Sequence, residues 1–326
     1  MKLLIVTVNY ASAEHILQNL DGLIAQVEAI GNTEIWIVDN NSPDDSVYIL
    51  RDGIVTHGLE HLVRLIESPV NGGFGAGNNI AFREALALSE PPSYIYLLNP
   101  DASPVPGTVA TLLQFMIEHP NIGVVGGALC DEQNNLQCSP FRFPSLLSEI
   151  EWSLKLGIVT KLLHNHRIAM ETPKHATPVD WVSGASMMLR CDVIEQIGMF
   201  DETFFLYWEE VDLCRRVWDA GYDIYFVPNA VVQHISGVTT GMGSPKKRIP
   251  NYWFKSRAHY LRKTFGFGKL TIFNLVVVFC TSLHRIRQYL GRKEVKSPHF
   301  LWDFIRYNFL SGHNEHSQSS SRKLNK

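Results

Sequence analysis

A run of apolar residues that ends in a polar turn occupies positions 94–101 and reads Tyr94-Ile95-Tyr96-Leu97-Leu98-Asn99-Pro100-Asp101. Five apolar residues bounded by a turn signal predict a short buried strand over 94–98. Similar short runs precede it at residues 3–8, 34–38 and 62–66, and helical patterns follow the first and third of them. Strands that alternate with helices predict an α/β domain with a mostly parallel sheet.

Polar residues stand where the predicted strands end. Asn9 and Tyr10 follow the first strand, Asp39 follows the second, and Asp101 closes the turn after the fourth. In parallel α/β sheets, ligands bind outside the carboxyl ends of the strands, so we expect a site there. A carboxylate at a strand end can hold a divalent cation, although Asn-Pro-Asp is also a common turn.

A loop rich in glycine and asparagine, residues 71–79, follows the third predicted strand. Its glycines permit unusual φ values and close backbone approach, so the loop can admit a phosphate or a base. It does not match the dinucleotide fingerprint G-x-G-x-x-G. Counted from Gly73 the third glycine falls on Asn78, and counted from Gly75 it falls on Ile80. A nucleotide-dependent oxidoreductase is therefore disfavoured.

The densest group of acidic residues begins a predicted helix that Gly221 closes. The helix dipole favours Glu209, Glu210 and Asp212 in the first turn and helps to keep them ionised, as a general base requires. The alternative is that these acids only stabilise the helix. His234 follows a later strand region, and a lone histidine is more often structural than a metal ligand.

Composition places the chain among globular proteins. It has 326 residues, of which 45% are hydrophobic and 19% charged, and this excludes a mainly disordered chain. The five cysteines form no CxxC pair, which disfavours a zinc site or a disulfide framework and fits a reducing compartment. Charge is uneven, because residues 245–326 hold 17 Lys and Arg against 3 Asp and Glu, whereas residues 1–244 hold 12 against 29.

The basic C-terminal segment suggests an anionic surface as its partner, and we expect no nucleic acid. Residues 270–283 are apolar and 300–310 are rich in aromatics, with a basic cluster between them. Fourteen residues are too few to cross about 30 Å of hydrocarbon as a helix, so we expect peripheral contact with a membrane. A helical core extension or an oligomer contact is the alternative. Residues 132–178 are expected to be irregular and to lie as a flexible excursion over a pocket.

Taken in order, the motifs resemble family 2 inverting glycosyltransferases, most closely the bacterial rhamnosyltransferase-like branch. The matching segments are 7–10, 38–42, 71–79, 98–101, 182–185, 198–215 and His234. The resemblance covers about residues 1–265 and implies a GT-A fold, which is a Rossmann-like, mostly parallel sheet flanked by helices. Residues 266–326 then form a helical, membrane-associating extension with a disordered tail.

The resemblance also implies a nucleotide-diphosphate sugar donor, Mg²⁺ or Mn²⁺ as cofactor, and roles for single residues. The last acid of the metal motif corresponds to Asp101, which also lies on the donor side, and His234 matches a histidine that completes the metal site in some members. Arg257 would add positive charge at the leaving diphosphate. The residues implied to line the donor pocket are Thr7, Asn9, Tyr10, Asp39 and Asn78 on the nucleotide side and Gly184 and Ala185 near the sugar.

In the family the base belongs to a Glu-Asp pair, which here reads Glu209-Glu210. We predict Glu210 as the base, and Glu209 is the other candidate because a glutamate reaches one methylene farther than the usual aspartate. Asn99 replaces the first acid of a fuller Asp-x-Asp, so Asp101 would bear most of the metal binding. The implied reaction is attack by an acceptor hydroxyl with inversion of the anomeric centre.

The implied function is transfer of L-rhamnose from dTDP-rhamnose to a lipid-linked or polysaccharide acceptor in cell-envelope glycan synthesis. The enzyme would lie in the cytoplasm, peripheral to the inner face of the cell membrane. A transferase of the same fold that uses another nucleotide sugar, such as UDP-hexose or UDP-galactofuranose, stays open. So does a non-catalytic nucleotide-sugar or glycan-binding module, which a degenerate set of acids would support, but the key positions are acidic here.

Overall fold

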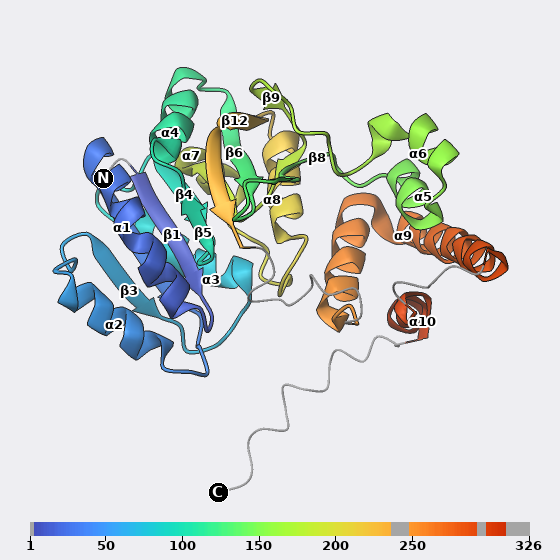
Figure 1. The fold of residues 1–326 in the computed structure, drawn as a ribbon, viewed down its shortest axis with the longest axis horizontal. Coiled ribbons are helices and arrows are strands. Elements are labelled where there is room, and N and C mark those ends of the chain that lie inside the picture. Colours follow the sequence, from blue (N-terminus) through green and yellow to red (C-terminus); the bar gives the residue numbers. More distant parts are fainter. Residues whose placement is uncertain (1–2, 236–247, 292–297, 311–326) are drawn as a thin grey trace, which may run out of the picture.

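The computed structural model describes residues 3–235, 248–291 and 298–310. A mixed sheet in the order β3-β2-β1-β4-β11-β6-β12-β5 forms its centre, with helices on both faces (Figure 1). The half of the sheet nearest the N-terminus is parallel, as predicted: β1 pairs with β2 and β4, and β2 pairs with β3. Its strands are β1 (Leu3–Asn9), β2 (Thr33–Asp39), β3 (Val63–Glu67) and β4 (Tyr94–Leu98).

The other half of the sheet mixes strand directions. β11 (Ser186–Arg190) runs antiparallel between β4 and β6 (Ile122–Cys130). β12 (Asp223–His234) is parallel to β6 and antiparallel to the short β5 (Ala102–Pro104). The remaining short strands are β7 (Leu136–Gln137) beside β6, β9 (Thr177–Pro178) beside β12, and the separate pair β8 (Pro140–Phe141) and β10 (Trp181–Val182).

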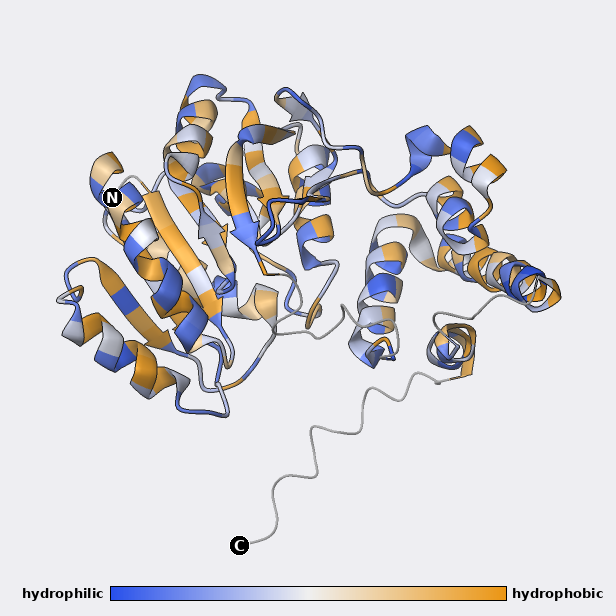
Figure 2. Cartoon of the chain, in the orientation of Figure 1, coloured by the Kyte–Doolittle hydropathy of each residue, from blue (hydrophilic) through white to orange (hydrophobic). Residues whose placement is uncertain are grey.

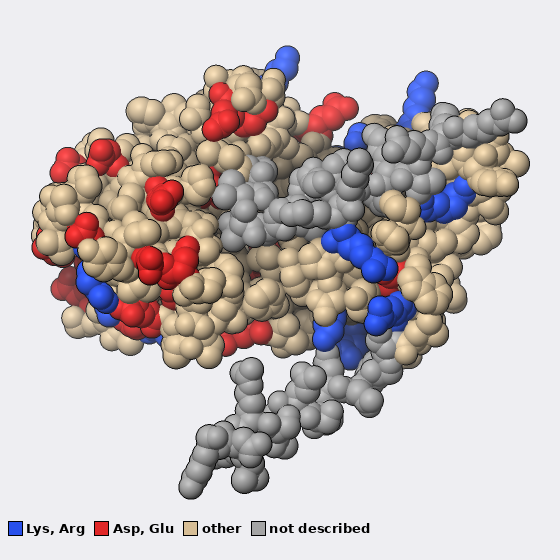
Figure 3. Space-filling view, turned by 60° about the horizontal axis from the view of Figure 1, so that its bottom comes forward, with Lys and Arg blue, Asp and Glu red and all other residues tan. Residues whose placement is uncertain are grey.

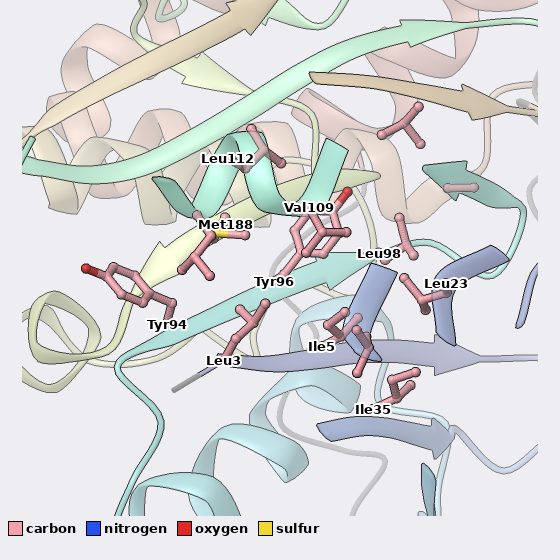
Figure 4. Packing of buried hydrophobic residues seen from close by; sticks show 14 of the residues in the cluster. Leu3, Ile5, Leu23, Ile35, Tyr94, Tyr96, Leu98, Val109, Leu112 and Met188 are labelled. Atoms are coloured by element: carbon pink, nitrogen blue, oxygen red, sulfur yellow. The ribbon is translucent and has the colours of Figure 1, made fainter. Parts of the chain in front are cut away.

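Two apolar layers hold the helices to the sheet. Because side chains alternate along a strand, Leu3, Ile5 and Tyr96 face one layer, together with α1, α2 and α4 (Figure 4). Leu4 and Val6 face the other layer, together with α3, α7 and α8. These helices are α1 (Ala13–Ile30), α2 (Ser46–Thr56), α3 (Phe74–Leu86), α4 (Thr108–Glu118), α7 (Cys191–Ile197) and α8 (Glu209–Asp219).

Residues 132–178 are more regular than predicted. They contain α5 (Leu146–Leu154), α6 (Gly157–Leu162) and a short 3₁₀ turn, η1 (His164–His166). α5 begins with a capping box, in which Ser145 Oγ accepts from the Ser148 N–H at 3.2 Å and Ser148 Oγ accepts from the Ser145 N–H at 2.9 Å. A serine at the position where glutamate or glutamine usually completes the box made this start hard to find in the sequence.

The C-terminal segment forms α9 (Asn251–Leu290), which bends at Gly266 with φ 81°, then α10 (Phe300–Ile305) and the π-helical turn η2 (Arg306–Leu310). The predicted division between residues 265 and 266 falls at this bend and stays a prediction. By length and composition alone α9 could cross a membrane, yet 33% of its most apolar stretch is buried inside the protein. The predicted disordered tail and the basic residues at 292–297 lie outside the described residues.

A buried ion pair joins α9 to α5. Arg257 is 1% exposed and donates to Glu149 Oε1 from Nε at 3.2 Å and from Nη2 at 2.8 Å. Its Nη1 donates to Asn274 Oδ1 at 2.8 Å, and Asn274 lies beyond the bend, so one guanidinium joins both halves of α9 to α5. The predicted role of Arg257 at a diphosphate finds no support here, because its side chain is buried and bound to these partners.

The Arg257→Met variant should lose about 3–5 kcal/mol of unfolding free energy, because Glu149 is left as a buried, unpaired charge. The double variant Arg257→Met/Glu149→Leu removes both charges and should recover most of that loss. Urea unfolding followed by circular dichroism measures both. Equal losses in the two variants would contradict the pairing as the source of the effect.

Candidate functional site

The polar ends of β1 and β2 meet at one edge of the sheet. Asn9 stands opposite Asp39 in the parallel register, and its Nδ2 donates to Asp39 Oδ1 at 2.7 Å. Ser42 Oγ donates to the same oxygen at 2.6 Å, and the Ser42 N–H donates to Asp39 Oδ2 at 3.0 Å. The Asp39 carboxylate is 2% exposed, so its orientation is fixed before any ligand binds.

The other residues predicted for the nucleotide side lie on β1, in the turn after it, and on α3. Thr7 is buried and lines a small hollow with Asn99 and Pro100, and Tyr10 is half-buried. Asn78 is buried, and its Nδ2 donates to the Phe74 carbonyl at 2.9 Å within α3. The contact of these three residues with a nucleotide stays a prediction.

Asp101 and His234 come together through the pairing of β5 with β12, which sets His234 opposite Ala102. Their atoms Oδ1 and Nε2 are 3.3 Å apart, and Asn99 Nδ2 is 3.4 Å from the same Nε2. Two ligands at right angles on one Mg²⁺ lie about 3 Å apart, so this pair fits a shared cation. A carboxylate oxygen with an imidazole nitrogen suits Mn²⁺ as well.

Two ligands do not complete a coordination shell. Within residues 3–235, 248–291 and 298–310, no three His, Cys, Asp or Glu side chains gather into one group that could hold a metal. A cation at Asp101 would therefore take its other ligands from outside the protein, such as the phosphate oxygens of a bound nucleotide and water.

Two adjacent acids, Glu209 and Glu210, begin α8. The residues before them, Tyr207 and Trp208, have φ values of 67° and 76°, a left-handed conformation that is costly for bulky side chains. Glu209 is 3% exposed, whereas Glu210 is partly exposed. The Oε2 atom of each carboxylate is buried and has no hydrogen-bond partner among the described residues. Strain and unpaired buried carboxylate oxygens together are typical of a functional site.

Burial raises the pKa of the Glu210 carboxyl to about 7. Burial also raises the pKa of Glu209 well above its usual value, and the negative charge on Glu210 raises it further. Both carboxyls are therefore harder to ionise than an ordinary glutamate, and the charge on Glu210 acts on Glu209 in addition to burial. The helix dipole was expected to help to keep Glu209, Glu210 and Asp212 ionised, but desolvation outweighs the dipole at the first two and raises their pKa.

The Gly-rich loop supports the segment that leads to these acids. Gly73 has φ 88°, and a Cβ there would collide with the carbonyl oxygen of Phe205. The Phe74 N–H donates to that same oxygen at 3.1 Å. Gly75 and Gly77 lie directly against Phe200 and Val8. In this structure the loop uses these glycines for close packing.

Gly184 and Ala185 lie between the strand end at Asp101 and the start of α8. A Cβ on Gly184 would touch the Phe74 ring at 3.2 Å and would lie 3.9 Å from Cβ of Glu210. The Asn99 N–H donates to the Ala185 carbonyl at 3.0 Å. The two residues therefore connect the candidate metal ligands with the candidate base.

Helix α9 contacts the segment that precedes α8 through polar side chains. Asp201 Oδ2 lies 2.7 Å from Lys263 Nζ and 3.0 Å from His259 Nε2, and Lys263 Nζ is also 2.8 Å from Asp212 Oδ1. Burial opposes ionisation, yet hydrogen bonds from Lys263 and His259 hold the pKa of Asp201 well below its usual range. Sequence reasoning missed this network, because no motif marks Lys263 and His259, which lie about sixty residues from Asp201.

Replacing Gly73 by Ala should displace the Phe205 carbonyl and lower the activity of the site by about a hundredfold, while the far-ultraviolet circular dichroism stays the same. Gly107→Ala is the matched control, because Gly107 also has φ 88° but has no atom within 4 Å of its Cβ position. The control should lose only about 1 kcal/mol of stability and keep its activity. Equal activity in the two variants would show that this contact does not position the acids.

The family model for glycosyl transferase family 2 matches residues 3–198, which is more than half of the chain. The chain belongs to glycosyl transferase family 2. This confirms the family that the motifs predicted, and it makes the chain a glycosyltransferase.

Relatives of this glycosyltransferase include two rhamnosyltransferases. The N-acetylglucosaminyl-diphospho-decaprenol L-rhamnosyltransferase of Mycobacterium tuberculosis is 27% identical over 249 residues, which are 73% of this chain and 77% of the relative. Rhamnosyltransferase WbbL of Escherichia coli strain K12 is 30% identical over 205 residues, which are 59% of this chain and 74% of WbbL.

Solved structures of low identity share the fold of this glycosyltransferase. The mannosyltransferase PcManGT from Pyrobaculum calidifontis, in complex with GDP-Man and Mn²⁺, matches with a TM-score of 0.55 and 15% identity over 92% of this chain and 78% of that one. GalNAc-T7 with UDP, GalNAc and Mn²⁺ matches with a TM-score of 0.54 and 14% identity. The match covers 72% of this chain but only 44% of that structure. The mixed sheet and these neighbours confirm the predicted GT-A-like fold.

Proposed function

We propose that this family 2 enzyme transfers L-rhamnose from dTDP-rhamnose to a hydroxyl of a lipid-linked or polysaccharide acceptor, with inversion. The observation that carries the chemistry is the Glu210 carboxylate, which is partly exposed, has a buried unpaired oxygen and has a pKa raised to about 7 by burial. The names of both relatives support the sugar. The diphospho-decaprenol in the mycobacterial name supports a lipid-linked acceptor.

The nucleotide of the donor would bind at the polar ends of β1 and β2. Asp39 is held by Asn9 and Ser42, so it presents a fixed carboxylate without a cost for ordering it on binding. Thr7 and Tyr10 on the same edge, with Asn78 on α3, would complete this side. Gly184 and Ala185, next to Glu210, would border the sugar.

Asp101 and His234 would hold Mg²⁺ or Mn²⁺ beside the diphosphate, because their facing atoms are 3.3 Å apart. When bound, such a cation neutralises the negative charge that develops on the leaving nucleoside diphosphate. Asp101 is fixed by the backbone, since the Ile235 N–H donates to its carbonyl at 3.1 Å.

Glu210 would take the proton of the acceptor hydroxyl while that oxygen attacks the anomeric carbon. A base with a pKa near the working pH is ionised often enough to act and is still basic enough to accept a proton. Glu209 is 3% exposed, whereas Glu210 is partly exposed, so Glu210 is the acid that an acceptor can reach. Attack from the face opposite the diphosphate inverts the centre, and no covalent intermediate on the enzyme is needed.

With a lipid-linked acceptor, the enzyme would act as a peripheral protein at the cytoplasmic face of the cell membrane, in cell-envelope glycan synthesis. This location is supported by the lipid-linked acceptor in the name of the mycobacterial relative and by the basic, apolar C-terminal segment.

The base assignment predicts the pH dependence of transfer. The value of kcat/KM should rise with pH and level off above about 7, because Glu210 carries the proton below that pH and cannot accept another. Glu210→Gln should lower turnover by about 10²–10⁴-fold and still bind donor. Glu209→Gln removes the buried neighbouring carboxyl and keeps its size, so it is the matched control and should keep turnover. Loss of turnover in Glu209→Gln alone would move the base to that residue.

A panel of nucleotide sugars tests the donor. Binding and slow hydrolysis are measured for dTDP-rhamnose, UDP-glucose and UDP-galactofuranose with Mn²⁺, with Mg²⁺ and with EDTA. We expect metal-dependent selection of dTDP-rhamnose, and Asp101→Ala should weaken the binding seen with metal. Selection of another sugar would overturn the proposed donor and leave the fold and the base unaffected. Equal affinity of the parent protein with metal and with EDTA would overturn the role of Asp101.

A further inference from the structure

The part of α9 that follows the bend at Gly266 is apolar on two opposite faces. One face is buried and contains Leu270, Phe273, Val277 and Cys280. Leu270 and Phe273 pack in one cluster with Val211 of α8, and Val277 packs with Phe304 of α10. The other face exposes a row of large apolar side chains at spacings of three and four residues, which a helix places in one line. This row, the α9 stripe, consists of Ile272, Leu275, Phe279, Leu283, Ile286 and Leu290, which are 39–75% exposed.

Large apolar side chains that form one row on an exposed helix face differ from the scattered exposed residues of most soluble proteins. Figure 2 shows the apolar colour continuing along this part of α9, outside the layers that cover the sheet. A shallow hollow is lined by Arg285 of α9 and by Leu301, Trp302 and Ile305 of α10. Trp302 is 58% exposed.

Charge on the described surface is divided along the molecule. In Figure 3 the Asp and Glu side chains gather over the α/β part, and many Lys and Arg side chains gather over the C-terminal helices. On α9 itself, Lys269, Arg285 and Arg287 follow the bend, and no Asp or Glu lies between Gly266 and Leu290. An apolar row accompanied by cations on one helix is the composition of helices that lie in the interface of anionic membranes.

We infer that the α9 stripe is a membrane-docking surface that lies in the plane of an anionic leaflet. Its apolar side chains would enter the boundary between headgroups and acyl chains, and Lys269 and Arg285 would contact lipid phosphates. Arg287 instead donates to the carbonyls of Leu154 and Lys155 at 2.9 and 3.1 Å. The acidic α/β part would be repelled by the same surface and would face away from it. The inference rests on the proposed function in one respect: membrane binding would bring the enzyme to its proposed lipid-linked acceptor.

The contacts of α9 favour lying in the membrane plane over crossing it. Asn274 is 4% exposed and accepts from Arg257, which is paired with Glu149 on α5. A spanning helix would have lipid on all sides, so it would have to leave these partners and carry Asn274 into hydrocarbon, where an unpaired polar group is costly. An in-plane helix keeps the buried face as it is.

Charge also favours a membrane over a second copy of the chain. Two copies joined stripe to stripe would bring the cations of both α9 helices together, and like charges oppose each other across an interface. An anionic lipid surface attracts the same cations.

The test measures co-sedimentation of the full chain with vesicles, without donor or acceptor. The vesicles are phosphatidylcholine alone or phosphatidylcholine mixed with phosphatidylglycerol, at low and high salt. We compare the parent with Leu275→Asp/Phe279→Asp and with the control Tyr48→Asp/Val55→Asp. The control makes the same kind of change at two apolar residues of α2 that are similarly exposed. Tyr48 and Val55 are 70% and 57% exposed, and Leu275 and Phe279 are 55% and 64% exposed.

We expect binding to the anionic vesicles that high salt weakens and that alkaline carbonate releases. The stripe variant should bind about tenfold less or worse, and the control should bind like the parent. Unchanged binding of the stripe variant would overturn the inference, as would resistance to carbonate, which indicates a spanning helix. A dimer in light scattering that the stripe variant abolishes, without vesicle binding by the parent, would assign the stripe to a second copy.

The same proteins are assayed for donor selection. Vesicle binding without dTDP-rhamnose selection would support this inference and overturn the proposed donor. Selection of dTDP-rhamnose without vesicle binding would support the proposed donor and overturn this inference.

Discussion

The chain enters α8 through two successive left-handed residues, Tyr207 and Trp208, and the arrangement of the site depends on that turn being held. Bulky side chains do not adopt this conformation unless the surrounding structure imposes it. Gly73 imposes it from one side by close approach to Phe205, and Lys263 of α9 does so from another through Asp201. The result is a fixed pair of acids whose burial raises both pKa values, that of Glu210 to about 7. Glu210 can therefore ionise near neutral pH.

Most of the fold could be predicted from the sequence, because its strands are short apolar runs, most of which end at polar residues. The strand at 94–98 has the predicted bounds, and its neighbours in the parallel half differ by one or two residues at their ends. The prediction failed at 132–178, where a serine-based capping box starts α5 without the usual glutamate. It also took residues 270–283 as an isolated stretch, whereas they are part of the 40-residue α9.

The candidate site was predicted unevenly for a physical reason. Residues at strand ends, such as Asn9, Asp39 and Asp101, could be placed because the carboxyl ends of parallel strands meet at one edge. The surroundings of a side chain could not be read in this way. A cation in the sequence looks the same whether it meets a diphosphate or a buried glutamate, and Arg257 meets Glu149. Likewise, the start of a helix suggests ionised acids until their burial is known, and burial reverses that expectation for Glu209 and Glu210.

The claim that Glu210 is the base is tested most directly by titrating the two acids themselves. Carbon-13 NMR of side-chain carboxyls in the full chain, with Glu209→Gln and Glu210→Gln used to assign the signals, follows each group through pH. We predict that the signal lost in Glu210→Gln titrates at about 7, and that the signal lost in Glu209→Gln titrates well above its ordinary range. A Glu210 signal that titrates near the ordinary value of about 4.3 would contradict the account.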